Sequence, residues 1–134
     1  MDNSAKLDEW NIIKKQIDSK TFKQKAGIQR IYWVNVGQNV GNEVYGKSEI
    51  FTRPVLIIKT FYNHTFLGVP LTSKFKHKRG KLYHKFIDSK GRIQTALLGQ
   101  IRIFDTKRLE TYISKIDDKN FKQIKEKIKR YVVE

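Results

Sequence analysis

Arg53 stands where a polar segment meets an apolar run, and its surroundings suit the binding of a phosphate group. The segment before it contains Gly41 and Gly46, and Pro54 follows it directly. Glycine lets a backbone approach a ligand closely, and proline fixes the local direction of the chain. A guanidinium held at a rigid strand start can bind a phosphate through two parallel hydrogen bonds. The alternative is an arginine at a strand end that simply extends into water.

Thr72 is expected to lie beside this arginine. Residues 54–60 and 65–72 are apolar runs separated by an Asn-His turn, a pattern that predicts a β-hairpin. In a hairpin the start of the first strand lies beside the end of the second, which brings Arg53 and Thr72 together. Alternatively, Thr72 and Ser73 only end a strand and begin a turn.

Acid–base chemistry would need a further group, and the sequence offers two candidates. Glu43, in the glycine-containing segment, can orient Arg53 or accept a proton, or it is a solvated carboxylate. His84 lies in an alternating segment, and histidine titrates near neutral pH. His64 and His77 lie in a turn and a basic loop, where we expect them to be solvated. The spacing of the histidines matches no metal-binding motif, and the sequence has no nucleotide-type phosphate-binding loop or dinucleotide fingerprint, so we expect no metal and no cofactor.

A basic loop around residues 73 to 81 carries one aromatic side chain among its cations. Single-stranded nucleic acid is bound by such mixtures, because bases stack on aromatic rings and phosphates pair with basic groups. The whole chain has 28 Lys and Arg against 13 Asp and Glu, a formal net charge of +15 that favours polyanions. Solvated lysine loops are also common, and an acidic protein is the alternative partner. The expected nucleic-acid-binding residues are Ser73, Lys74, Lys76, Lys78, Arg79 and Lys81.

The composition excludes several classes of protein. Without cysteine the chain can hold no disulfide, thiolate zinc site or thiol nucleophile. No run of the sequence approaches the ~18 consecutive apolar residues of a membrane helix, and the N-terminus lacks the apolar core of a signal segment. We therefore expect a cytoplasmic protein that has no membrane partner.

The hydrophobic pattern predicts short strands between two helices. Residues 5–19 repeat apolar side chains at helical spacing, and a basic linker follows up to residue 28. From residue 29 the apolar residues alternate, and five or six short strands joined by tight turns are expected. In the first strand Ile31 and Trp33 point to one face and Tyr32, Val34 and Val36 to the other, so we expect both faces to be covered. The second helix starts at Asp117 or Asp118 as its cap, and with Asp117 as cap Ile116 and Phe121 stand at the positions of a hydrophobic staple. Its apolar stripe is Phe121, Ile124, Ile128 and Tyr131.

These elements predict a mainly β, α+β fold: a small, partly closed antiparallel barrel with a C-terminal helix and an extra N-terminal helix. We divide the chain into a helical extension and linker over residues 1–28 and a barrel domain over residues 29–134. The extension is expected to pack on its own barrel through Leu7, Trp10, Ile13 and Ile17. Alternatively, it covers a dimer surface or binds another protein.

Four blocks of the sequence resemble, in this order and spacing, the MazF/PemK toxins of bacterial type II toxin–antitoxin systems. They are WVNVGQNVGNE, TRPVLII, VPLTS and QTALLGQIRIFDTKRL, and the resemblance covers about residues 29 to 133. It implies an SH3-like barrel, a homodimer and a cognate antitoxin that inhibits the toxin. The implied activity is that of an mRNA interferase, a metal-independent and sequence-specific endoribonuclease that cuts single-stranded RNA.

The resemblance also assigns roles to individual residues. The family's catalytic arginine falls on Arg53, its catalytic threonine or serine on Thr72, and the glutamate of its first loop on Glu43. The implied reaction is attack of an RNA 2′-hydroxyl on its own phosphodiester, with Arg53 stabilising the charge that develops. Because arginine stays protonated at ordinary pH, Glu43 and His84 remain the alternatives for the base.

The resemblance leaves two features open. It does not extend to the first 28 residues, and the segment before Arg53 is longer than is usual in the family. A different class of function also remains: a module of the same fold that holds RNA, DNA or a protein without chemistry, for example a topoisomerase-binding toxin. The presence of both Arg53 and Thr72 favours the enzyme.

Overall fold

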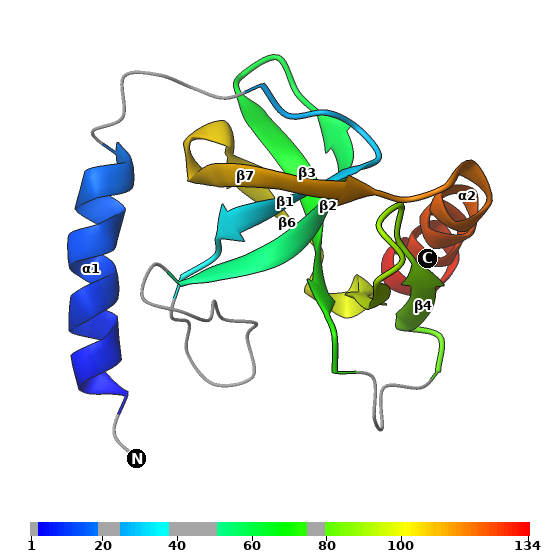
Figure 1. The fold of residues 1–134 in the computed structure, drawn as a ribbon, viewed down its shortest axis with the longest axis horizontal. Helices are drawn as coiled ribbons and strands as arrows, with labels where there is room; N and C mark the ends of the chain where they lie inside the picture. Colours follow the sequence, from blue (N-terminus) through cyan, green and yellow to red (C-terminus); the bar gives the residue numbers. More distant parts are fainter. Residues whose placement is uncertain (1–2, 19–24, 38–50, 75–79) are drawn as a thin grey trace.

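Seven antiparallel strands with a helix near each end form the part of the chain that the computed structural model describes, residues 3–18, 25–37, 51–74 and 80–134 (Figure 1). The helices are α1 (Ser4–Asp18) and α2 (Asp118–Lys127), and a π-helical segment, η3 (Ile128–Val133), continues α2. The strands are β1 (Arg30–Asn35), β2 (Thr52–Thr60), β3 (Thr65–Thr72), β4 (Tyr83–Ile87), β5 (Ile93–Leu97), β6 (Arg102–Asp105) and β7 (Leu109–Lys115). Short 3-10 turns, η1 (Leu98–Gln100) and η2 (Thr106–Arg108), flank β6. This architecture confirms the predicted fold class.

The central strand, β3, divides its pairing among three neighbours. The strand order is β4-β5-β3-β2-β1-β7, and β6 pairs with β3 outside this path, so the barrel does not close on itself. Residues 65–68 of β3 pair with β6 and residues 66–70 pair with β2, whereas Leu71 and Thr72 pair with β5. The first β2–β3 pair is Val55 with Pro70, so Arg53 lies before the paired region. The turn of β3 toward β5 therefore leaves space at the start of β2.

Two apolar clusters fill the interior on opposite faces of the central strands. Ile31 and Leu56 belong to the cluster that α2 covers, whereas Tyr32 and Val55 belong to the other. Successive residues of a strand point to opposite faces, which explains this division and confirms that β1 is covered on both sides. Trp33, which we expected to share the face of Ile31, remains 38% exposed.

One strand boundary and one whole strand differ from the sequence prediction. Pro54, expected to begin a strand, is the third residue of β2 and pairs with Trp33. It precedes the first β2–β3 pair, so only one of its sides has a paired strand, which is where proline is tolerated.

Strand β7 was not predicted at all. Its pairing with β1 shifts register twice, and such bulges break the alternation that marks a strand.

The start of α2 follows its predicted capping signal. Asp117 is the cap, because its side chain accepts hydrogen bonds from the backbone amide of Asn120 at 3.1 Å and from its Nδ2 at 2.8 Å. Ile116 and Phe121, on either side of the cap, belong to the same core cluster, which confirms the predicted staple. The helix is thereby fixed against β4 and β5.

Asp88 fastens the β4–β5 turn to β7. Its buried carboxylate accepts hydrogen bonds from the hydroxyl of Ser114 at 2.9 Å, from Gln94 Nε2 at 3.4 Å, and from the amides of Lys90 and Arg92 at 2.9 and 3.0 Å. Burial raises the pKa of Asp88, but these hydrogen bonds outweigh it and leave the pKa below its ordinary value. Arg92 directly precedes β5 and Gln94 is its second residue, so this carboxylate also fixes the edge of the site described below.

We expect Asp88→Asn to destabilise the fold at neutral pH by about 1–3 kcal/mol, because an amide cannot accept all four bonds. A depressed folded-state pKa contributes stability above the unfolded value of about 3.9, and that contribution is lost as the pH falls through the folded value. The variant should therefore lose less stability than the wild type between about pH 5 and pH 3. Urea unfolding at several pH values measures both effects. The exposed Asp8→Asn is the matched control, and equal pH dependence in all three proteins would contradict the assignment.

Candidate active site

Arg53 and Thr72 line one pocket of about 740 Å³ at the start of β2. The Nη1 of Arg53 donates a hydrogen bond to the carbonyl oxygen of Leu71 at 3.3 Å, which ties the guanidinium to the residue beside Thr72. Arg53 is only 9% exposed, so its charge is partly shielded from water and its side chain is held in place. The neighbourhood expected from hairpin geometry is therefore present in the structure.

Thr72 presents its hydroxyl in a fixed orientation. It is buried, and its Oγ1 accepts a hydrogen bond from the backbone amide of Lys74 at 3.1 Å. Because the oxygen accepts this bond, the hydroxyl hydrogen can be donated to a ligand. Ser73 also lines the pocket. Together with Arg53, these side chains offer several hydrogen-bond donors to a single anion.

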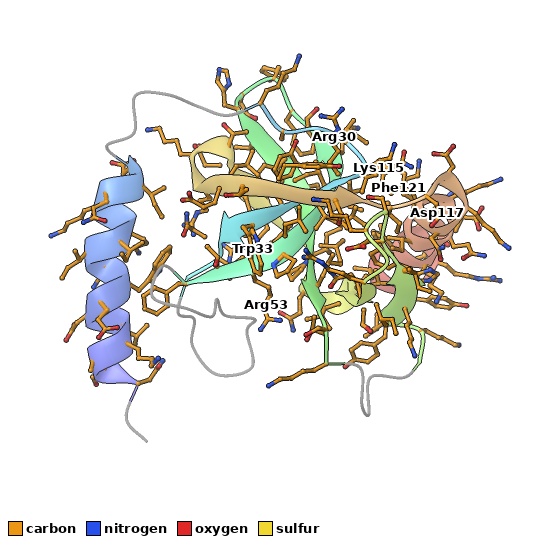
Figure 2. The ribbon with its side chains drawn as sticks, in the orientation of Figure 1. Arg30, Trp33, Arg53, Lys115, Asp117 and Phe121 are labelled. Atoms are coloured by element: carbon orange, nitrogen blue, oxygen red, sulfur yellow. The ribbon has the colours of Figure 1, made fainter. Side chains whose placement is uncertain are left out.

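Trp33 forms an apolar wall of the pocket. It pairs with Pro54 across β1 and β2, and Figure 2 shows its side chain in the same region as that of Arg53. An exposed aromatic face beside an arginine suits a nucleobase stacked next to a bound phosphate. Sequence reasoning did not single out Trp33, because both faces of β1 were expected to be covered.

Glu110 and Arg92 also line the pocket, and sequence reasoning missed both. The carboxylate of Glu110 accepts a short hydrogen bond from Nδ2 of Asn35. Asn35 also donates to the carbonyl of Arg108 at 3.4 Å, and Nη1 of Arg108 donates to the carbonyl of Asn35 at 3.0 Å. This network sets the position of the carboxylate. A prediction of β7 from the sequence would have placed Glu110 on a strand beside β1.

His84 is not among the described residues that line the pocket. Its Nε2 lies 2.8 Å from the side-chain oxygen of Asn120 on α2. Burial lowers the pKa of His84, and the hydrogen bond with Asn120 opposes this effect without cancelling it. The imidazole is therefore neutral at neutral pH and is held against the helix, apart from Arg53 and Thr72.

Several predicted residues lie outside the described part of the chain. These are Glu43, Lys76, His77, Lys78 and Arg79. Of the remaining basic-loop residues, Lys74 follows the pocket directly, and the Nζ of Lys81 lies 5.0 Å from the ring centroid of Tyr131. His64 lies in the turn between β2 and β3. Within the described ranges, no helix is long and apolar enough to cross a membrane.

One pocket of this open β-barrel therefore contains an arginine, a threonine and a carboxylate. The family model for the PemK-like, MazF-like toxins of type II toxin–antitoxin systems matches residues 29–132. This chain belongs to that family. In this PemK/MazF-like toxin the matched region contains Arg53, Thr72 and Glu110, whereas α1 lies before it.

Solved structures share the fold of this PemK/MazF-like toxin at low sequence identity. MazF of Deinococcus radiodurans superposes with a TM-score of 0.67 at 18% identity, covering 83% of this chain and 99% of that one. A mycobacterial endoribonuclease in complex with its cognate antitoxin gives 0.63 at 12% identity, covering 81% and 96%. The MazE–MazF structure of D. radiodurans gives 0.58 at 16%, covering 83% and 96%. No curated protein matches the sequence significantly.

Proposed function

We propose that this toxin is a sequence-specific endoribonuclease that cuts single-stranded RNA in the cytoplasm and is inhibited by a cognate antitoxin. The observation that carries the proposal is the buried Arg53 guanidinium, held beside Thr72 in a pocket of a toxin-family barrel. Two structural relatives are MazF proteins and one is named an endoribonuclease, which supports the same activity here. The bound antitoxins in two of these structures support an antitoxin as partner, and the family resemblance supports a homodimer.

The proposed reaction is attack of an RNA 2′-hydroxyl on the adjacent phosphodiester. The new bond joins the 2′-oxygen to phosphorus, and the bond to the 5′-oxygen breaks. The leaving 5′-oxygen takes a proton from water, so the products carry a 2′,3′-cyclic phosphate and a 5′-hydroxyl. Arg53 binds the phosphate oxygens, on which negative charge accumulates in the transition state. Thr72 donates a hydrogen bond to the same group. Ser73, Lys74, Lys76, Lys78, Arg79 and Lys81 are the proposed contacts for the flanking RNA.

The proton of the 2′-hydroxyl needs an acceptor, and we propose a carboxylate. Glu43 is the choice that the family resemblance supports, and Glu110 is the carboxylate that lines the described pocket. His84 lies against α2 and is not among the described residues of this pocket, so we leave it out of the reacting set. Comparison of Glu43→Gln with Glu110→Gln in a cleavage assay tells the two apart, since the loss of the base lowers the rate of the chemical step.

Cleavage of a long single-stranded RNA by the purified protein tests the proposal. With EDTA present, we expect discrete fragments whose ends carry a 2′,3′-cyclic phosphate, because the donors of the pocket can act without a metal ion. Mapping these ends also gives the sequence that is cut. Intact RNA that nevertheless binds the protein would overturn the proposal and favour the non-catalytic binding module.

A further inference from the structure

Helix α1, which precedes the matched region, packs on the barrel at the point where β2 begins. Trp10 and Ile17 of the helix are buried together with Phe51, and Trp10 is only 5% exposed. The ring centroids of Trp10 and Phe51 lie 5.6 Å apart. Gly37 provides the room, because a Cβ there would come within 2.4 Å of the indole. This docking agrees with the expectation that the extension packs on its own barrel.

The docked tryptophan holds the residue that leads into the candidate site. Phe51 stands two positions before Arg53 and has a φ of 55°, a left-handed conformation that a bulky side chain rarely adopts. Such a conformation persists only where its surroundings fix it. The carbonyl of Phe51 accepts hydrogen bonds from the amides of Val36 at 3.1 Å and Gly37 at 3.2 Å, and Trp10 packs against its ring. The entry of β2 is thus fixed from two sides.

Trp10 also contacts the hydrogen-bond network that holds Glu110. The guanidinium of Arg108 lies 5.5 Å from the centroid of the Trp10 ring. Arg108 in turn exchanges hydrogen bonds with Asn35, and the side chain of Asn35 donates to Glu110. One indole therefore touches the approach to Arg53 and the network that holds Glu110.

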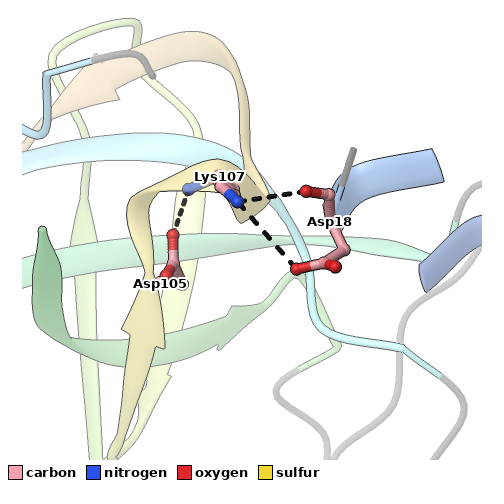
Figure 3. Close-up of polar contacts among 3 residues, drawn as sticks. All are labelled: Asp18, Asp105 and Lys107. Atoms are coloured by element: carbon pink, nitrogen blue, oxygen red, sulfur yellow. Dashed lines mark hydrogen bonds and ion pairs between the residues drawn. The ribbon is translucent and has the colours of Figure 1, made fainter. Parts of the chain in front are cut away.

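A second contact fixes the end of α1 (Figure 3). The Nζ of Lys107 donates to the carbonyl oxygen of Asp18 at 3.0 Å and lies 3.9 Å from its carboxylate, while the amide of Lys107 donates to Asp105 at 2.8 Å. The Asp18 side chain is 92% exposed, so the ion pair itself contributes little. A cation at the last carbonyls of a helix is nevertheless favourable, and this contact holds the C-terminal end of α1 against η2.

We propose that Trp10 is a positioning residue: through Phe51 and Arg108, it holds Arg53 and Glu110 in the geometry that cuts RNA. Small displacements of reacting groups lower rates strongly even when the substrate still binds. Loss of the indole should therefore lower kcat more than it weakens RNA binding. The kinetic part of this inference rests on the proposed endoribonuclease activity, whereas the structural part does not.

The test compares Trp10→Ala, Trp10→Phe and the control Ile12→Ala in the full chain, since Ile12 lies on α1 and is 60% exposed. We expect Trp10→Ala to lower kcat roughly ten- to a hundredfold with little change in KM. Trp10→Phe should restore most of the rate, because a ring again packs on Phe51, and Ile12→Ala should match the wild type. If Trp10→Ala does not fold, Trp10→Leu takes its place, since it keeps an apolar side chain but loses the ring contacts. An unchanged kcat in a folded variant would overturn the proposal.

Amide hydrogen exchange separates this inference from the proposed activity. The amides of Val36 and Gly37 bind the carbonyl of Phe51, so in Trp10→Ala they should exchange about tenfold faster or more, with little effect in Ile12→Ala. Unchanged exchange at these amides would overturn the positioning role even if the protein cuts RNA. If the amides exchange faster in Trp10→Ala but the wild-type protein cuts no RNA, the proposed activity is wrong and the structural coupling between Trp10 and Phe51 still holds.

Discussion

We expect Arg53→Ala to lower the rate of RNA cleavage by roughly 10² to 10³ and to leave the barrel folded. The guanidinium lines the same pocket as Thr72 and is held there by its hydrogen bond to the carbonyl of Leu71. Its donors match the phosphate oxygens, whose negative charge grows in the transition state. Loss of the guanidinium should therefore destabilise the transition state more than the bound substrate. Single-turnover cleavage of a mapped RNA oligonucleotide measures this effect.

Two further variants separate the position of the charge from its mere presence. Arg53→Lys keeps one positive charge but lacks the planar pair of donors, so we expect most of the rate to be lost as well. Arg30→Ala removes the same charge from β1, but Arg30 is exposed and is not among the described residues of the pocket, so its rate should stay near that of the wild type. An Arg53→Ala protein that is folded by circular dichroism and cuts at the wild-type rate would end the assignment.

The neighbourhood of Arg53 and Thr72 was predictable because it depends on local structure. A short turn between two apolar runs fixes which ends of a hairpin meet, and β2 and β3 meet as expected. The cap of α2 was predictable for the same reason, since Asp117, Asn120 and Phe121 lie within one turn of helix. Signals of this kind need no knowledge of the rest of the fold.

The other wall of the pocket was not predictable, because it depends on contacts between distant parts of the chain. Glu110 lies on β7, whose two register shifts against β1 hide its alternation from the sequence. Trp33 stays partly exposed only because the surrounding strands leave a pocket beside it. His84 shows the converse: its strand was predicted, but the sequence could not show that α2 would cover its side chain.

The docking of α1 was predictable in part: its apolar face is a local feature of the sequence, but its position depends on contacts with distant residues. The apolar face that carries Trp10, Ile13 and Ile17 is visible in the sequence, and it predicts that the helix packs against something. Its position on the barrel depends on Gly37 and Phe51, which are paired by the hydrogen bond between their backbones. A glycine in an irregular segment gives no sign that it makes room for an indole from another element.

An RNA oligonucleotide with a single deoxyribose at the scissile position should not be cut. The proposed nucleophile is the 2′-hydroxyl of that nucleotide, and its replacement by hydrogen leaves the reaction without an attacking group. Arg53, Thr72 and the flanking basic residues contact phosphate oxygens in this proposal, so the analogue should still bind. The expected result is therefore product below detection together with a Kd close to that of the all-RNA oligonucleotide.

The matched control carries the deoxyribose one nucleotide further along, where it leaves the reacting hydroxyl intact and cleavage should continue. This pair of substrates decides between two ways of breaking the same bond. If water attacked the phosphorus, the analogue would be cut as well, and the product would end in a simple phosphate instead of a 2′,3′-cyclic one. Cleavage of the analogue would thus remove the 2′-hydroxyl mechanism but keep the nuclease, because Arg53 stabilises the charge on phosphorus whichever nucleophile attacks.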